Sequence, residues 1–366
     1  MITLSPTLLR LADWLGRRPR LEAVAQKVAP GLGRLGRNPR LAEVAEKSWL
    51  LAPAQTSVVP PAFFDEDDLA RVSDVGIDTT RELEWRRICG GAVEHRASVA
   101  YLLRDAVLSK GHVILPQLVR RVTTGPLPMW GRYVETELDP ALLTATFNGS
   151  RYFGHWMTDE LTLMLAAPRI GQPVAPPRPM SSHQRPYLEL FHLVRAVRSD
   201  VRFRQLIIMD DKGQNAYKRE RYQELRERAR RGRHGVPCEG VMLLRKQTGE
   251  SRVLVNEEEL AEQLVQRGFR TMCPAEHTVE ELVNACMGAK IVLGVEGSQM
   301  FHALFPMHDA GTLVVLQPPN RFNNILKTYC DCLGFRYAFT VGHPREQGFF
   351  VELAQVMRLL DRLPGL

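Results

Sequence analysis

The feature that most constrains the fold is a regular alternation of short apolar runs and helical segments from Val241 to Leu360. Apolar runs bounded by helices are typical of buried strands in a parallel sheet that helices cover on both faces. We therefore expect an α/β fold in this half of the chain. The predicted strands are 241–244, 270–273, 291–293, 312–316 and 336–340, and the predicted helices are 257–266, 279–287, 298–305, 323–332 and 351–360. Asn256 with Glu259, and Thr278 with Glu281, have the spacing of capping boxes at two helix starts.

The preceding segment, residues 71–236, has a mixed pattern. Short β-rich runs come first, then helices at about 152–166 and 186–197 on either side of a proline-rich loop, a strand at 206–209 and a basic helix ending at Arg233. The arginines of that last helix alternate with glutamates, which predicts a solvated face. A chain of 366 residues is long enough for two domains.

The basic charge of the chain is concentrated at its N-terminus. The net charge is +7, and residues 1–50 contain nine Lys/Arg and four acids, so the other residues carry only +2. This distribution argues against nucleic acid as a partner of the main body. Residues 15–28 and 35–47 form a tandem repeat that predicts two short amphipathic helices, packed on the body or on a second copy of the chain. A membrane-surface anchor with Trp14 and Trp49 is the alternative, and 52–61 is expected to be a linker.

Cysteine usage and hydropathy bear on the compartment. The six cysteines form no C-x-x-C pair, which argues against a zinc site or a disulfide framework and favours a reducing cytoplasm. No apolar stretch approaches the ~20 residues that span a bilayer, and the N-terminus does not resemble a signal peptide. We expect a cytoplasmic protein, with membrane contact only through residues 1–50.

A glycine turn follows the third strand of the C-terminal half. Ligands of open parallel sheets bind at the carboxyl ends of the strands. Gly294 and Gly297 allow close approach of backbone N–H groups to an oxyanion, and Ser298 opens the next helix, whose N-terminus adds partial positive charge. The turn therefore predicts a phosphate cradle, although many strand-to-helix turns have this form for conformational reasons alone.

Cations follow the first strand of the same half. Arg245 and Lys246, with Arg252 beyond them, suit a diphosphate, although an exposed hairpin with surface cations is the alternative. Gln317, at the end of the fourth strand, could read a base or ribose edge. A P-loop and an early G-x-G-x-x-G are both missing from the sequence, which argues against ATP hydrolysis by that route and against a dinucleotide-dependent dehydrogenase.

A second group of chemically competent residues lies at 148–160. His155 and Asp159 are four residues apart, so on a helix they share one face. An imidazole and a carboxylate placed together can accept the proton of a hydroxyl nucleophile. A helix cap beside a partly buried histidine is the plainer alternative. Asn148 and the aromatic residues around the pair favour a functional site.

These groups, in this order, resemble the family-61 glycosyltransferases, often described as capsular polysaccharide biosynthesis proteins. The first motif is matched by Asn148, Phe153, His155, Trp156 and Asp159, the second by Leu244, Arg245, Arg252 and Asn256, and the third by Gly294–His302. Glu296 stands where the family commonly has histidine, and His302 where asparagine is common.

The resemblance implies a GT-B architecture with two Rossmann-like domains. It implies an acceptor-side domain at 61–236, a donor-binding domain at 237–366 and a final helix that packs back on the first domain. The implied reaction is an inverting sugar transfer from a nucleotide-sugar, UDP- or GDP-linked, to a glycan or lipid-linked glycan in capsular or exopolysaccharide assembly. No cofactor and no metal are expected, since only Asp210-Asp211 could form a carboxylate pair after a strand.

The residue patterns and the resemblance together assign expected roles to individual residues. The residues expected to act catalytically are Asp159, His155 and Glu296; those at the donor are Arg245, Lys246, Arg252, Gly294, Gly297, Ser298, His302 and Gln317; those at the acceptor are Asn148, Trp156 and Glu160. A non-catalytic scaffold of the same fold, or a sugar-nucleotide epimerase, is the alternative function. The N-terminal repeat lies outside the motifs, so we expect it to be dispensable for chemistry.

Overall fold

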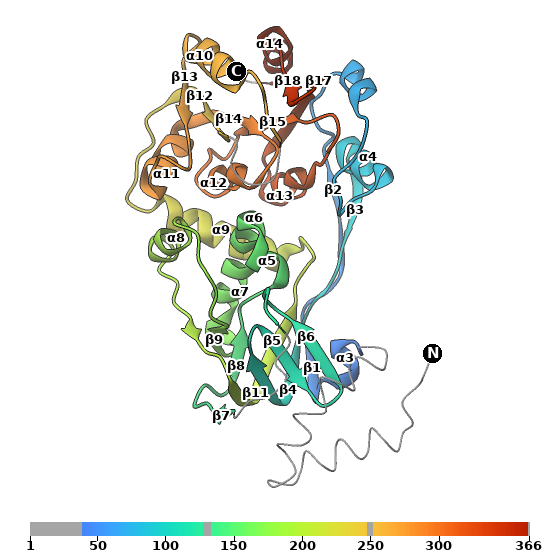
Figure 1. Ribbon diagram of the computed structural model, residues 1–366, viewed down its shortest axis with the longest axis vertical. Helices are drawn as coiled ribbons and strands as arrows, with labels where there is room; N and C mark the ends of the chain where they lie inside the picture. Colours follow the sequence, from blue (N-terminus) through green and yellow to red (C-terminus); the bar gives the residue numbers. More distant parts are fainter. Residues whose placement is uncertain (1–38, 127–132, 247–251, 365–366) are drawn as a thin grey trace. The chain divides into compact units, whose positions relative to one another are not determined.

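The computed structural model describes residues 39–126, 133–246 and 252–364. The chain divides into two compact units (Figure 1). Unit 1 joins the stretch that ends at Pro53 to Arg96–Gly213, and unit 2 joins Ala54–His95 to Gln214–Leu366. Each unit contains parallel strand pairs and helices, so the predicted α/β class is confirmed. Among the described residues, no helix combines the length and the hydropathy needed to cross a bilayer.

Unit 1 is built on a nine-stranded mixed sheet. Seven strands have the order β10-β9-β8-β11-β4-β5-β6, while β1 pairs with β4 and β7 with β11. The strands are β1 (Lys47–Ala52), β4 (Ser98–Ser109), β5 (His112–Leu115), β6 (Leu118–Arg121), β7 (Val134–Glu135), β8 (Ala141–Leu143), β9 (Gln172–Ala175), β10 (Ala196–Val197) and β11 (Val201–Asp210). The two longest strands, β4 and β11, run antiparallel, and side chains such as Leu103 and Leu206 from them are buried in one core.

After β8, the chain of unit 1 forms a series of helical segments. They are α5 (Phe147–Arg151), α6 (Phe153–His155), a π-helix (Trp156–Glu160), α7 (Leu161–Ala166), a 3-10 turn (Ala167–Arg169) and α8 (Gln184–Leu190). Thr146 caps α5, its hydroxyl accepting the N–H of Gly149 at 2.9 Å. The helix expected at 152–166 is present, but a π-helical turn interrupts it.

Unit 2 contains a fully parallel five-stranded sheet of order β13-β12-β14-β15-β16. The strands are β12 (Cys238–Leu243), β13 (Phe269–Met272), β14 (Ala289–Val295), β15 (Thr312–Gln317) and β16 (Arg336–Val341). All six residues of β15 are buried, as expected for a strand with helices on both faces. Two antiparallel strand pairs complete its strands: β2 (Gln55–Val59) with β3 (Gly91–His95), and the hairpin of β17 (His343–Arg345) with β18 (Gly348–Phe350).

The helices of unit 2 connect these strands. They are α4 (Arg81–Cys89), α9 (Ala216–Arg230), α10 (Glu257–Val265), α11 (Val279–Gly288), α12 (Phe301–Leu304), α13 (Ile325–Leu333) and α14 (Leu353–Asp361). The capping box of Thr278 and Glu281 at the start of α11 is confirmed. The one expected at Asn256 is wrong, because the Asn256 side chain instead donates to Val351 O (2.8 Å) and accepts from Val351 N (3.3 Å).

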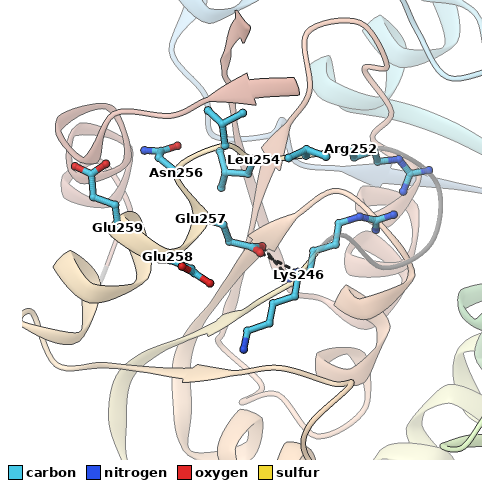
Figure 2. Close-up of a pocket in the computed structure, with 10 residues that line it drawn as sticks. Lys246, Arg252, Leu254, Asn256, Glu257, Glu258 and Glu259 are labelled. Atoms are coloured by element: carbon cyan, nitrogen blue, oxygen red, sulfur yellow. Dashed lines mark hydrogen bonds between the residues drawn. The ribbon is translucent and has the colours of Figure 1, made fainter. Parts of the chain in front are cut away.

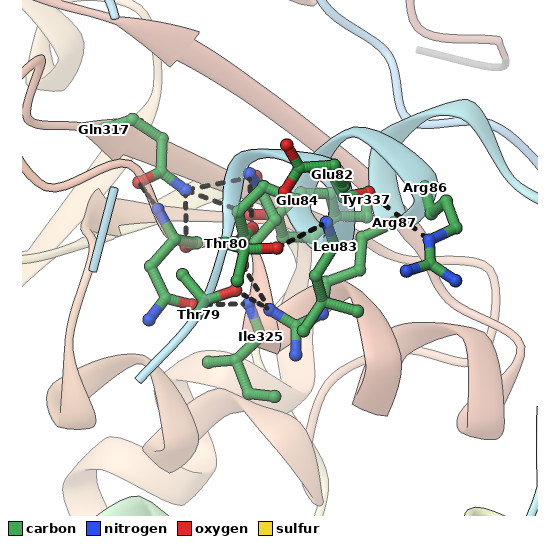
Figure 3. A network of polar contacts seen from close by, with 12 residues as sticks. Thr79, Thr80, Glu82, Leu83, Glu84, Arg86, Arg87, Gln317, Ile325 and Tyr337 are labelled. Atoms are coloured by element: carbon green, nitrogen blue, oxygen red, sulfur yellow. Dashed lines mark hydrogen bonds and ion pairs between the residues drawn. The ribbon is translucent and has the colours of Figure 1, made fainter. Parts of the chain in front are cut away.

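Buried carboxylates attach the segment 54–95 to the rest of unit 2. Asp68 accepts hydrogen bonds from Thr340 Oγ1 (2.5 Å) and Val341 N (3.1 Å) at the end of β16. Glu84, 1% exposed, accepts from Asn324 N (2.6 Å) and Thr79 Oγ1 (2.6 Å), as Figure 3 shows for the network around α4. Each carboxylate thus joins a local element to a strand or helix more than 200 residues away.

Several sequence expectations differ from this arrangement. The unit boundaries, at 53/54, 95/96 and 213/214, differ from the expected 60/61 and 236/237. The expected linker contains β2, and α14 buries Val356, Leu359 and Leu360 in the core of unit 2. The first copy of the repeat lies outside the described residues. In the described part of the second copy, residues 39–47, Leu41–Val44 is helical; Trp49 lies in β1, paired with Ala100.

The basic helix, α9, is also more buried than its sequence suggests. Arg226 has a side chain 2% exposed, and its guanidinium donates to the carbonyls of Leu304 (3.2 Å), Phe305 (3.1 Å) and Met307 (2.9 Å). Burial lowers the pKa of Arg226 to about 10. The prediction of a fully solvated face is therefore wrong at Arg226, because its guanidinium satisfies carbonyls at the end of α12.

Candidate functional site

The first candidate site lies at the carboxyl edge of the unit 2 sheet. Arg245 follows β12 and is 6% exposed, and its Nη1 donates to Gln299 Oε1 at 3.0 Å. Arg252 donates from Nη1 to the backbone oxygen of Glu296, the residue after β14, at 3.2 Å. Two guanidinium groups therefore converge on the turn that leaves β14, as the sequence predicted for a diphosphate site.

A buried carboxylate lies among these cations. Glu296 is 5% exposed, and its Oε2 is 3.0 Å from Nε of Arg252. Burial raises the pKa of Glu296, and the positive charges of Arg252, Arg321 and Arg245 oppose that rise. Burial, followed by repulsion from Arg252, lowers the pKa of Arg245. One carboxylate thus offsets part of the charge of three arginines.

The glycine at position 297 makes this convergence possible. Its φ is +154°, and a Cβ there would lie 2.2 Å from Arg245 Nη1, 2.5 Å from Gln299 Oε1 and 3.0 Å from Arg252 Nη1. Any side chain would therefore displace the guanidinium groups. The close approach at Gly297 is thus one of arginine side chains, and the predicted approach of backbone N–H groups to an oxyanion stays a prediction.

A cavity of about 530 Å³ adjoins the cations. Arg245, Lys246, Arg252 and the residues from Val253 to Glu259 line it (Figure 2). The Glu257 carboxylate accepts the backbone N–H groups of Arg245 (2.8 Å) and Lys246 (2.9 Å), which fixes the chain where β12 ends. Lys246 adopts a positive φ of 42°, and its Nζ pairs with Glu276 at 2.6 Å.

The second candidate site lies in unit 1, where the π-helix begins. His155 Nδ1 and Asp159 Oδ2 are 3.1 Å apart, and their side chains are 34% and 28% exposed. The predicted pair is therefore formed and reaches solvent. π-helical turns occur often at functional sites, and this one places Asp159 outward while the next residue, Glu160, is fully buried.

Comparison with protein families bears on both sites. The family model for Glycosyltransferase 61 matches residues 153–315, a range that includes the His155–Asp159 pair and the Arg245–Gly297 cluster. The resemblance to family 61 is confirmed. No curated protein matches the chain.

Within the family-61 segment, Glu160 has a different position from the one expected. Both of its oxygens are held in ion pairs at 2.7 Å, by Arg178 Nη1 and Nη2 and by Arg195 Nη1, and its Oε1 accepts the N–H of Thr146 at 3.0 Å. A fully buried carboxylate with these partners fixes the start of α5 to the loop at Arg178. This geometry does not support the predicted contact of Glu160 with substrate.

The other predicted acceptor residues differ in exposure. Trp156 is fully buried, so its ring packs in the core, where it lies 5.7 Å from the ring of Phe153. Asn148 is exposed on α5, in reach of a ligand. The predicted substrate role of Trp156 therefore has no support in this geometry, whereas that of Asn148 stays a prediction.

Three predicted donor residues are engaged within the unit 2 fold. Gln317 is fully buried and donates to Asn323 O (2.8 Å) and Asn324 Oδ1 (3.1 Å), so its amide is not open to a base or ribose. His302 is 3% exposed in α12. A Cβ at Gly294 would lie 2.7 Å from the carbonyl of Leu243, so this glycine permits strand packing.

The helix expected to start at Ser298 is short. A 3-10 turn, Ser298–Met300, comes first, and α12 has only four residues. The N-cap residue of this turn is Gly297, which has no side chain to form a capping hydrogen bond. The expected contribution of a helix N-terminus to phosphate binding is therefore small, and the arginines carry the positive charge of the site.

Arg321 and Gln299 lie at the site but were not predicted from the sequence. Arg321 is in the loop after β15, and its charge acts on Glu296. Its position after a predicted strand of the same sheet was the available signal, because neighbouring parallel strands place their carboxyl ends at one edge. Gln299 gave no such signal, because the sequence placed it inside a predicted helix. Among the described residues, no group of three His, Cys, Asp or Glu could hold a metal, and Asp211 accepts a hydrogen bond from Ser98 Oγ at 2.7 Å.

Proposed function

We propose that the chain is an inverting, metal-independent glycosyltransferase of GT-B type. It would transfer a sugar from a nucleotide-sugar, UDP- or GDP-linked, to a glycan or lipid-linked glycan of a capsule or exopolysaccharide. The observation that carries the proposal is the convergence of Arg245 and Arg252 on Gly297, at the ligand-binding edge of a parallel sheet within a family-61 segment.

The proposed reaction is a single displacement at the anomeric carbon. An acceptor hydroxyl gives its proton to Asp159, or to His155 held by Asp159, while its oxygen forms the new glycosidic bond. The bond from the anomeric carbon to the diphosphate breaks, and its electron pair stays on the departing phosphate oxygen. Attack on the face opposite the leaving group inverts the anomeric configuration.

In this proposal the cations of unit 2 take the place that a divalent ion has in other transferases. Guanidinium groups fixed in advance stabilise charge that develops on the leaving diphosphate without reorganising during the reaction. Arg245 is 6% exposed and hydrogen-bonded, and Gly297 leaves its guanidinium room. Transfer should therefore continue in excess EDTA, and a loss that Mg²⁺ or Mn²⁺ restores would contradict this part.

The decisive test is turnover of a panel of nucleotide-sugars by wild type and Asp159→Asn. Loss of a base from an intact site typically lowers the rate about 10²- to 10⁴-fold, and nucleotide affinity should be unchanged. His155→Ala should resemble it if the pair acts as a unit. Asp105→Asn, an isosteric change at a carboxylate 58% exposed in unit 1, is the matched control.

Each outcome of this test separates the candidates. Wild-type-like turnover by Asp159→Asn would show that the base lies elsewhere. Nucleotide binding without any turnover by wild type would favour the scaffold function, and a changed sugar product without acceptor would favour an epimerase. Cytoplasmic location, and contact with a membrane or a second copy through residues 1–50, remain part of the proposal.

A further inference from the structure

A cationic aromatic face lies beside the His155–Asp159 pair in unit 1. Phe147, the first residue of α5, has two guanidinium groups over its ring: that of Arg121 from β6 at 4.9 Å and that of Arg151 from the end of α5 at 5.6 Å. Figure 1 shows β6 and α5 near one another in unit 1. Stacking over an aromatic ring orients a guanidinium while leaving its hydrogen-bond donors available.

The face is continuous with the proposed base. Arg151 also lies over the ring of Tyr152, 5.0 Å from its centroid, and the rings of Tyr152 and His155 are 6.0 Å apart. His155 in turn is 3.1 Å from Asp159. A chain of contacts therefore links Arg151, through the ring of Tyr152, to the His155–Asp159 pair.

Arg121 and Arg151 differ from those exposed arginines of unit 1 that pair with a carboxylate. Exposed Arg104 pairs with Glu46, and exposed Arg204 pairs with Glu135 at 2.9 Å. Arg121 donates from Nε to the carbonyl of Thr123 at 3.2 Å, and neither Arg121 nor Arg151 forms an ion pair with another described residue. Two guanidinium groups that no described carboxylate pairs with, beside the proposed catalytic pair, favour an anionic ligand.

We propose that the acceptor is an acidic glycan whose sugar next to the reacting hydroxyl carries a carboxylate, as a uronic acid does. This inference rests on the proposed function. The rings of Phe147 and Tyr152 hold the guanidinium groups of Arg121 and Arg151 in place by stacking. The planar fork of an arginine matches a carboxylate, and Arg121 and Arg151 supply two of them. Residues 51–366 carry a net charge of only +2, which disfavours an extended polyanion such as nucleic acid.

The test compares ligands that differ only at C6: methyl glucuronide, methyl glucoside and methyl glucoside 6-phosphate. Their affinities for the full chain are measured by NMR titration. We expect the glucuronide to bind about tenfold more tightly than the glucoside, the lower end of the effect of a hydrogen bond to a charged group. Arg121→Gln with Arg151→Gln should abolish this preference, and Phe147→Ala, which removes the ring that orients both guanidinium groups, should reduce it.

The control is Arg185→Gln, which removes an exposed arginine of α8 that pairs with Glu189 and should keep the preference. Equal affinity for the acid and the neutral sugar, no binding of either, or a preference that survives the double variant in a folded protein would overturn the inference. Tighter binding of the 6-phosphate would overturn it in favour of a phosphorylated acceptor. Nucleotide-sugar turnover is measured separately, so its absence would count against the proposed function while the binding preference still decides this inference.

Discussion

Gly297→Ala tests the donor site most directly, because the structure shows which atoms an added methyl group would contact. The Cβ would lie 2.2 Å from Nη1 of Arg245 and 3.0 Å from Nη1 of Arg252. Both atoms are the far ends of flexible side chains, so the guanidinium groups can move away and the fold can persist. The stability cost is then mainly that of alanine in a backbone region essentially restricted to glycine, φ +154° and ψ 178°, about 1–3 kcal/mol.

The cost to nucleotide binding should be larger. Displacing a guanidinium from a diphosphate removes a hydrogen bond to a charged group, about 1.5–3 kcal/mol, which corresponds to an affinity loss of about 10- to 150-fold. Calorimetric titration of UDP and GDP into Gly297→Ala measures this loss, and a thermal melt measures the stability.

Gly334→Ala is the matched control. Gly334 ends α13 with a φ of +79°, and nothing lies within 4 Å of the position of its Cβ. This variant should therefore lose stability through backbone strain yet bind nucleotide as wild type does. Unchanged affinity in folded Gly297→Ala, or an equal loss in Gly334→Ala, would refute the assignment of the arginines to the diphosphate.

Three further outcomes are expected. Arg321→Ala should weaken UDP or GDP binding about tenfold by calorimetry, because it removes a cation from the Glu296 cluster; unchanged affinity would place Arg321 outside the site. Because burial raises the pKa of Glu296, its carboxyl gains a proton at a higher pH than an ordinary glutamate does. Glu296→Gln should therefore bind nucleotide more tightly than wild type where Glu296 is ionised, and the two affinities should converge as the pH falls, whereas an affinity ratio that does not change with pH would refute this. A chain that starts at Pro39 should keep turnover and the unit 1 fold by circular dichroism, whereas one that starts at Ser57 lacks β1 and should lose that fold; a stable Ser57 chain would show that the β1–β4 pairing is dispensable.

The strands of unit 2 could be predicted because buried parallel strands are continuous apolar runs, and β14 and β15 fall where the sequence places them. The assignment of residues 54–95 to unit 2 could not be predicted. It depends on Asp68 and Glu84, which in the sequence look like surface acids and become buried only through partners at 340–341 and 324. Local patterns contain no information about such distant partners.

The sequence also could not distinguish the roles of two adjacent acidic residues at the proposed base. Asp159 and Glu160 are adjacent acids, and helical spacing alone allows either to face a ligand. In the structure a π-turn places Asp159 beside His155, 28% exposed, while Glu160 is buried between Arg178 and Arg195. Because Arg178 and Arg195 already neutralise Glu160, this carboxylate holds α5 in place. Asp159 is therefore the acid of this pair that remains accessible to an acceptor.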